Sequence, residues 1–269
     1  MLLIDIEQLT LKYFQNSEEV PYKVKKGEPL LIKPILVKDY SIYENSIGIL
    51  TIDKNSIGDI EIIKMSYLNF ILALIQQNEG KNDFCNKFYN ICELCLGEKN
   101  IAFDIDKGKV VLVILNEDNN IKTIINHKEF DEIIKIILNQ NDANYDNRYI
   151  SPEVKELMME YNLIKYKNIH NPSLEERKAF VCSKIGKTFK DLNNMTYREF
   201  DLIYNANVNS EIYIGEKIIQ GSYKYDVKEE IVHPLFKVKE DPYAKIFEDT
   251  NKLSGKGISG AEQLNKMNI

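Results

Sequence analysis

The chain has 269 residues, of which 44% are hydrophobic and 28% are charged, so it can bury a substantial core and is long enough for two domains. The formal net charge of −6 argues against a nucleic acid or an anionic membrane as partner. Only Arg148, Arg177 and Arg198 are arginines among 35 basic residues, and arginine is the side chain best suited to gripping phosphates.

The beginning of the chain predicts neither export nor membrane insertion. Residues 1–9, MLLIDIEQL, include an acid at position 5 and no basic residue, unlike a secretory signal. The longest apolar run, 65–75, is too short to span a bilayer and suits a buried helix. These features predict a cytoplasmic protein.

The first hundred residues predict a mixture of helices and extended segments. Proline removes a donor from a strand, so Pro34 is expected to interrupt the extended chain around it. Glycine commonly ends helices, so Gly97 is expected to end the helix before it. The expected elements are strand or helix at 1–14, extended chain at 30–40, a strand at 47–52, and helices at about 58–77 and 82–97.

Residues 101–140 predict a small antiparallel sheet with one helix across it. IAFDID at 101–106 and VVLVILN at 110–116 flank the turn residues Lys107 and Gly108, which favours a hairpin. IKTIIN at 121–126 predicts a third strand. Asn126 then caps a helix whose apolar residues share one face and can pack on the sheet, namely Phe130, Ile133, Ile134 and Ile137.

The second half of the chain predicts a helical unit behind a polar linker at 139–148. Ser151 and Pro152 begin a helix with an apolar stripe formed by Val154, Leu157, Met158 and Tyr161. Three hydroxyl residues then stand three positions before an acid, as in capping boxes, and predict helices at 174–185, at 188–194 and from Tyr197. These pairs are Ser173 with Glu176, Thr188 with Asp191, and Thr196 with Glu199.

The expected fold class is therefore α+β. We expect a mixed α/β domain with a small antiparallel sheet at 1–140, a helical domain at 150–225, and an extended, partly mobile tail at 226–269. In the long helix from Tyr197, the apolar residues that keep a helical register are Phe200, Ile203, Tyr204, Val208 and Ile212.

The cysteines and histidines are the first candidates for chemistry. Cys85, Cys92 and Cys95 fall on one predicted helix face, and Cys182 stands apart, so a closed zinc site lacks its remaining ligands and core cysteines are the better interpretation. The histidines are His127 in a predicted first turn and His170 and His233 beside loop prolines. Without a serine elbow or an HExxH motif, they are interpreted as surface or capping residues.

Two glycine-containing motifs resemble phosphate-binding sequences. Residues 186–188, GKT, follow a predicted helix and lack the upstream glycine of a phosphate loop, because position 181 is valine. Gly186 is instead expected to end one helix and Thr188 to begin the next. Residues 255–260 match a dinucleotide fingerprint by letter but follow no apolar strand. No nucleotide cofactor is expected.

Two groups of acids could in principle hold metal ions. Asp142, Asn144, Asp146 and Glu153 occupy ligand positions of a calcium loop, but Asn147 replaces its glycine and Pro152 interrupts its end, so a polar linker is favoured. Asp104 and Asp106 share a strand face without a third acid. A metal-dependent enzyme or regulator, built on 142–153 or on the cysteines, stays an alternative that metal analysis would decide.

Four segments carry a resemblance to a known class of protein. They are LLIKPILVKDY, DKNSIGDIEIIKMSYLNFI, INHKEFDEIIKIILNQN and SLEERKAFVCSKIGKTFKDLNNMTYREF, and they cover about 30–220. Together they resemble tail-region proteins of tailed bacteriophages and phage-derived particles of low-GC Gram-positive bacteria. KIGKTFKDLNNMTYREFDLIY is similar to the helix, short helix and Met-Thr-x-x-x-Phe helix of tail assembly chaperones, although many of those are shorter.

The resemblance implies a non-enzymatic protein of phage tail morphogenesis with no catalytic, cofactor or metal residues. It would bind other tail proteins, namely tape measure, tube or baseplate subunits, in the host cytoplasm during assembly. The alternative is a structural component of the tail or baseplate that is retained in the virion. Sixteen tyrosines and no tryptophan also suit a protein-binding surface; those toward the end of the chain include Tyr213, Tyr223, Tyr225 and Tyr243.

Overall fold

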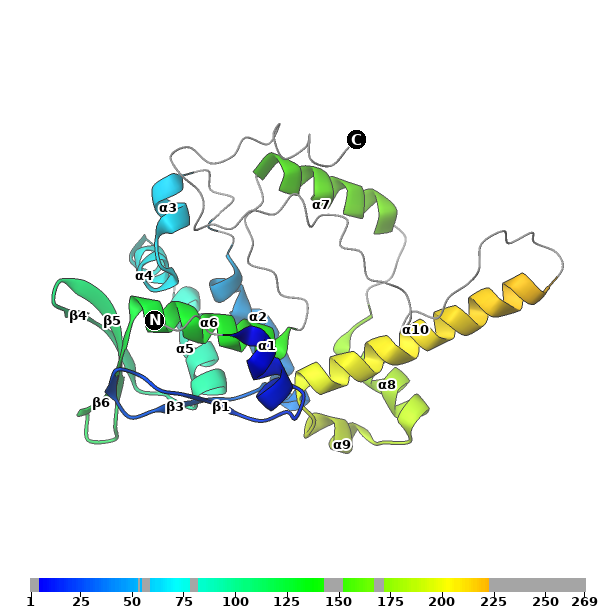
Figure 1. Cartoon of the computed structure of the whole chain (residues 1–269), viewed down its shortest axis with the longest axis horizontal. Helices are drawn as coiled ribbons and strands as arrows, with labels where there is room; N and C mark the ends of the chain where they lie inside the picture. The colour runs from blue at the N-terminus through cyan, green and yellow to red at the C-terminus, as the bar shows by residue number, and fades with distance from the viewer. Residues whose placement is uncertain are drawn as a thin grey trace.

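The computed structural model describes residues 5–52, 54, 59–77, 82–142, 152–166 and 172–222. The fold is α+β, as expected, and combines helices with small antiparallel sheets that lie at one edge of the described chain (Figure 1). A long helix at the end of the described chain, α10 (Tyr197–Gly221), extends away from the sheet. The expected tail at 226–269 lies outside the described residues.

Helical structure begins the described chain, so of the two expected alternatives, strand or helix, the described part of 1–14 is a helix. Asp5 caps α1 (Ile6–Leu9) by accepting hydrogen bonds from the backbone N–H groups of Glu7 and Gln8, and a π-helical turn, η1 (Thr10–Phe14), follows. The extended segment expected at 30–40 is confirmed at its beginning as β3 (Leu30–Ile32), which pairs antiparallel with β1 (Val20–Tyr22), but it is wrong from Val37 onward, where a 3₁₀ turn begins. Both strands alternate buried and exposed residues, as a half-covered pair should.

The strand predicted at 47–52 is wrong, because these residues belong to a helix. A 3₁₀ turn, η2 (Val37–Asp39), leads into α2 (Tyr40–Thr51). The buried residues of α2 are Tyr43, Ser46, Ile49 and Leu50, spaced so that they share one helical face, and this face packs on α5 (Asn82–Leu96). Tertiary packing therefore outweighs the strand preference of the isoleucine and threonine residues in IGILTI.

The single helix predicted at 58–77 is in fact two. α3 (Ile60–Lys64) ends where Met65 turns to extended backbone, and α4 (Tyr67–Gln77) begins two residues later. The carboxylate of Asp131 accepts a 2.9 Å hydrogen bond from the backbone N–H of Tyr67 and so satisfies the first turn of α4. The helix predicted at 82–97 is confirmed as α5, and Gly97 follows it at φ 72°.

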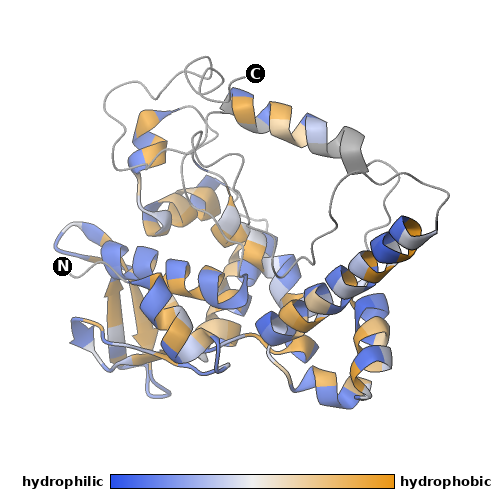
Figure 2. Cartoon of the chain, turned by 45° about the vertical axis from the view of Figure 1, so that its right-hand side comes forward, coloured by the Kyte–Doolittle hydropathy of each residue, from blue (hydrophilic) through white to orange (hydrophobic). Residues whose placement is uncertain are grey.

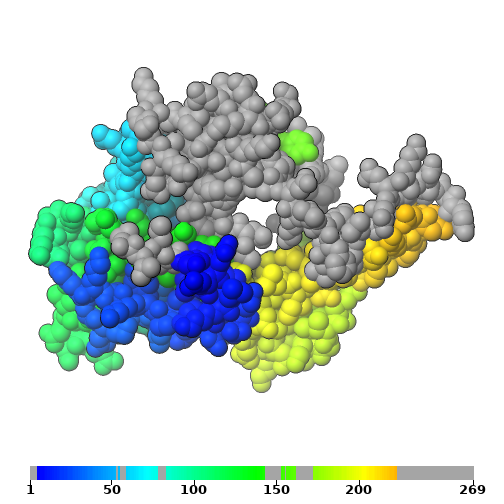
Figure 3. All heavy atoms as spheres, viewed as in Figure 1, coloured from blue at the N-terminus to red at the C-terminus, as the bar shows by residue number. Residues whose placement is uncertain are grey.

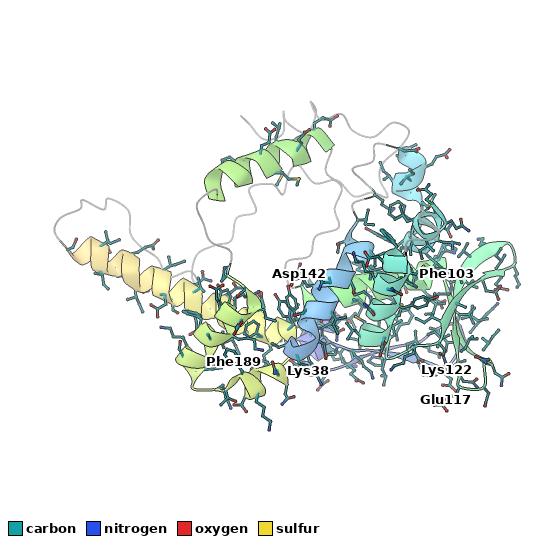
Figure 4. All side chains as sticks on the ribbon, turned by 180° about the vertical axis from the view of Figure 1, so that it is seen from behind. Lys38, Phe103, Glu117, Lys122, Asp142 and Phe189 are labelled. Atoms are coloured by element: carbon teal, nitrogen blue, oxygen red, sulfur yellow. The ribbon has the colours of Figure 1, made fainter. Side chains whose placement is uncertain are left out.

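The predicted hairpin and third strand are confirmed. β4 (Ile101–Asp106), β5 (Lys109–Leu115) and β6 (Ile121–Asn126) pair antiparallel, and β2 (Lys26–Gly27) completes a four-stranded sheet of order β2-β6-β5-β4. The turn residues Lys107 and Gly108 both have positive φ, as a two-residue hairpin turn requires. Phe103, labelled in Figure 4, leaves β4 toward the helices and stacks on Phe88 of α5.

The predicted helix after β6 is confirmed as α6 (His127–Asn141), with Asn126 and Glu129 forming a capping box. Its apolar face packs against β5 and β6. The linker predicted at 139–148 starts too early, because Gln140 and Asn141 are helical and buried. The side chain of Asn141 accepts a 2.8 Å hydrogen bond from the backbone N–H of Ile35, which explains a buried amide there.

Asp131 on α6 makes stability depend on pH. Burial raises its pKa to about 6, although the hydrogen bond from Tyr67 and the charge of Lys54 oppose the shift. The folded state then holds the proton more tightly than the unfolded state, so this group costs stability as pH rises from about 4 to 6. We expect the free energy of unfolding of Asp131→Asn at pH 7.5 to exceed that of wild type by about 1–2 kcal/mol.

Urea unfolding of both proteins from pH 4 to pH 8 measures this effect. The advantage of Asp131→Asn over wild type should be small at pH 4 and should grow until about pH 7. An advantage that is constant with pH, or a loss of stability at pH 7.5, would show that Asp131 is not the titrating group.

Four helices form the described C-terminal part: α7 (Pro152–Tyr166), α8 (Leu174–Ile185), α9 (Phe189–Asn193) and α10. The three predicted N-caps are confirmed at Ser173, Thr188 and Thr196. In the stripe predicted on α7, Val154 is buried, whereas Leu157 and Tyr161 are about half exposed. The predicted division into domains at 1–140 and 150–225 stays a prediction.

Candidate interaction surface on helix α10

Local signals in the sequence build the α8–α9–α10 unit. Ser173 and Thr188 form complete capping boxes with Glu176 and Asp191, which fixes where α8 and α9 begin. Gly186 has φ 67° and ends α8 in the left-handed conformation that glycine adopts readily. The GKT motif is therefore a helix-to-helix connection, as the sequence indicated.

The unit has its own small hydrophobic core, which also includes one residue from the N-terminal half. Val181, Leu192 and Phe200 come from α8, α9 and α10, and Val37 of η2 packs among them. Arg177 of α8 lies over the rings of Phe200 and Tyr204 and forms an ion pair with Asp201. This core holds the first half of α10 against α8.

The beginning of α10 is also tied to the N-terminal half. The backbone N–H of Tyr197 donates to Ile35 over 2.7 Å, and the backbone N–H of Val37 donates to Met195 over 3.0 Å. Arg198 donates from its guanidinium to the carbonyl of Asn139 over 2.7 Å. These bonds fix the direction in which α10 leaves the body of the protein (Figure 3).

The contacts between α8 and α10 advance in the same direction along both helices and end at Glu211, where α8 ends. Arg177 meets Asp201, Phe180 meets Tyr204, and Lys184 forms an ion pair with Glu211. Lys184 lies one residue before the end of α8. Residues after Glu211 therefore extend beyond their neighbouring helix, as Figure 1 shows.

Apolar side chains continue past that point. Four isoleucines of the last ten residues of α10 are about half exposed or more, and Ile218 is 67% exposed; they are Ile212, Ile214, Ile218 and Ile219. We call residues 212–221 with these side chains the α10 extension. Figure 2 shows hydrophobic residues reaching this far along the helix.

Part of the extension continues the face of the helix that α8 covers earlier. Phe200, Tyr204, Glu211 and Ile218 are separated by four and seven residues, so they form one stripe at 3.6 residues per turn. The stripe is buried at Phe200, meets α8 at Tyr204, and is exposed at Ile218. Among the described residues, a helix covers this face in its first half and none covers it in its second.

Two of the predicted core cysteines are confirmed as core residues. Cys92 and Cys95 are buried in the larger core, and burial raises the pKa of the Cys92 thiol to about 12 and that of Cys95 as well. Cys85 and Cys182 are half-buried. Among the described residues, no three His, Cys, Asp or Glu side chains come close enough to hold a metal ion.

The remaining candidate residues are scattered. His127 begins α6, and burial together with Lys109 lowers its pKa. Asp104 is exposed on β4, whereas Asp106 pairs with Lys26 at 2.6 Å. Asp142, labelled in Figure 4, ends α6. Asn144, Asp146, His170, His233 and residues 255–260 lie outside the described part of the chain, and Glu153 is exposed at the start of α7.

A hollow of about 250 Å³ lies where α2, α6 and α10 meet. Its walls include Tyr40 and Tyr197, whose rings stack 3.7 Å apart, and Asp201, which is paired with Arg177. These groups are engaged in joining the two halves of the described chain. The hollow is therefore a weaker candidate for a functional site than the exposed face of α10.

Comparison with protein-family models, with curated protein sequences and with solved structures gives no significant match. No helix in the described part of the chain is both long enough and apolar enough to cross a membrane. Sequence reasoning placed Ile212 in the register of a long helix but did not find the extension. The sequence does contain the information, because isoleucines continue along α10 after Glu211, the last residue of α10 that contacts α8.

Proposed function

We propose that this protein is a non-enzymatic assembly protein that binds another protein through the α10 extension. The observation that carries the proposal is the exposure of four isoleucines on the α10 extension, of which Ile214 and Ile218 continue the face that α8 covers earlier in the helix. Covering four isoleucines removes apolar surface from water, which is the main driving force for association. A helix of the partner that continues the line of α8 would fit this face.

The resemblance to phage tail proteins gives the proposal its biological setting. In that setting the partner is a tail protein, with the tape-measure protein as the first candidate and tube or baseplate subunits next. Binding takes place in the host cytoplasm during assembly, without nucleic acid or membrane. The α10 extension and an apolar helix of the partner then cover each other and keep both apolar surfaces out of water until the tail is built.

Co-expression with a tape-measure protein from the same source as this chain provides the test. We expect the two proteins to co-purify, and Ile218→Glu to weaken binding at least about tenfold, because it puts a charge into an apolar contact. Ile105→Glu on β4 is the matched control, since Ile105 is 70% exposed and far from α10 in the chain. It should bind like wild type.

Two results would overturn the proposal. One is a wild-type protein that binds neither the tape-measure protein nor tube or baseplate subunits. The other is equal binding by Ile218→Glu and Ile105→Glu. Mass spectrometry of purified particles separates an assembly factor, which is absent from them, from a structural component, which is retained.

A further inference from the structure

Exposed lysines from three chain segments gather where the β4–β5 hairpin meets the beginning of α6. Val111 of β5 pairs with Asn126 of β6. Because these strands are antiparallel, Lys109 and Lys128 both lie two residues beyond that pair, at the same end of the sheet. The backbone N–H of Lys25 donates a 2.8 Å hydrogen bond to a glutamate in the first turn of α6, which brings a third segment there. We call the exposed side chains of Lys25, Lys109 and Lys128 the lysine patch.

The acids beside the lysine patch are bonded to other groups. Asp106 stands opposite Lys109 in the hairpin, but its carboxylate pairs with Lys26 at 2.6 Å. The carboxylate of Asp104 accepts a 2.7 Å hydrogen bond from the backbone N–H of Ile105. Within the described part of the chain, no side chain of the lysine patch forms an ion pair. Three cations therefore stand together without a carboxylate partner.

The three charges act together on one neighbouring side chain. Burial, and then the charges of Lys109, Lys128 and Lys25, lower the pKa of His127 at the start of α6. Like charges that lie this close repel one another, so their grouping costs stability in the free protein. The whole chain carries a formal charge of −6, so the patch differs in sign from the protein around it. An anionic group placed on the patch would relieve the repulsion.

The form of the patch indicates which anion fits. Each lysine is exposed and comes from a different segment, so the three do not enclose a single phosphate, and lysine lacks the planar fork of arginine. A nucleic acid or an anionic membrane would extend past the patch over a surface of the same sign as itself. A short acidic segment of a protein covers the patch alone, and charges farther than about 10 Å away are screened by salt.

We propose that the lysine patch binds an acidic segment of a partner protein, with aspartate or glutamate side chains at closely spaced positions. The three segments lie inside the ranges 5–52 and 82–142, so the chain on both sides of each lysine is described. The patch is separate from the α10 extension, because β4 and β5 lie at one side of Figure 1 and α10 at the other. The inference therefore does not depend on the proposed function.

Titration of the full chain with a hexaglutamate peptide, followed by amide NMR shifts, tests the inference. We expect a dissociation constant on the order of 0.1–1 mM at about 20 mM salt, because exposed ion pairs are individually weak. Binding should weaken at least about fivefold at about 150 mM salt, where such pairs are screened. The largest shifts should fall at residues 25, 109 and 128 and their neighbours.

A variant that carries Lys25→Gln, Lys109→Gln and Lys128→Gln should bind the peptide at least about tenfold more weakly than wild type. Its side chains are exposed, so the fold should be unaffected.

The matched control changes three other exposed lysines that form no ion pair in the described part of the chain, and so removes the same charge. It carries Lys38→Gln, Lys64→Gln and Lys190→Gln. Its binding should stay within about twofold of wild type, because these lysines lie outside the patch.

Three results would overturn the inference. The first is a peptide that causes no shifts at the lysine patch at low salt. The second is an equal loss of binding in the patch variant and the control, which would make the effect one of net charge alone. The third is tighter binding of a hexathymidylate oligonucleotide or of phosphatidylserine vesicles than of hexaglutamate, which would assign the patch to a phosphate-bearing partner.

Discussion

Phe200→Asp should unfold the α8–α9–α10 unit. Phe200 is 0% exposed and lies in the small core with Val181 and Leu192. Removing a buried phenylalanine costs about 3–5 kcal/mol, and a buried carboxylate adds to this cost. Arg177 above the ring is already paired with Asp201, so it offers little compensation. We expect a loss above about 5 kcal/mol, measured as loss of amide-exchange protection over 174–221.

Phe189→Asp on α9 is the matched control. Phe189 is 40% exposed and contacts Lys178, so a carboxylate there stays hydrated and close to a cation. Its effect on thermal unfolding should be within about 1 kcal/mol. Retained thermal stability in Phe200→Asp would show that Phe200 is not a core residue and that the α10 extension is not held in the way described.

Gly27→Ala should detach β2 from β6 and weaken the sheet. Gly27 has φ 108°, which residues with a side chain rarely adopt, and an added Cβ would lie 2.4 Å from the carbonyl oxygen of Lys122 and 2.6 Å from the Cα of Thr123. Both contacts are with backbone, which cannot move without breaking the pairing. We expect a loss of about 2–4 kcal/mol in urea unfolding.

Gly48→Ala provides the comparison, because it adds the same methyl group in open space within α2. It should be neutral or stabilising by up to about 1 kcal/mol. Equal stabilities for Gly27→Ala and Gly48→Ala would contradict the strained approach of β2 to β6.

The features that the sequence predicted well are specified by a few neighbouring residues. The caps at Asn126, Ser173 and Thr188, and the turn at Lys107 and Gly108, are local arrangements of backbone and side chain. Each needs only residues within three or four positions. These elements appear where the sequence placed them.

The features that the sequence missed depend on distant residues. IGILTI at 47–52 is helical because α5 covers its buried face, and the break before α4 is capped by Asp131, more than sixty positions later. The α10 extension was missed for the same reason. Its register is visible in the sequence, but its exposure follows from where α8 ends.

Photo-crosslinking at position 218 tests the docking role of the α10 extension most directly. A photoreactive benzophenone amino acid replaces Ile218 in one protein and Ile105 in another, and each is irradiated with the co-expressed tape-measure protein. The account predicts an adduct between the tape-measure protein and position 218, and none with position 105. Adducts of equal yield at the two positions, or none at 218, would contradict it.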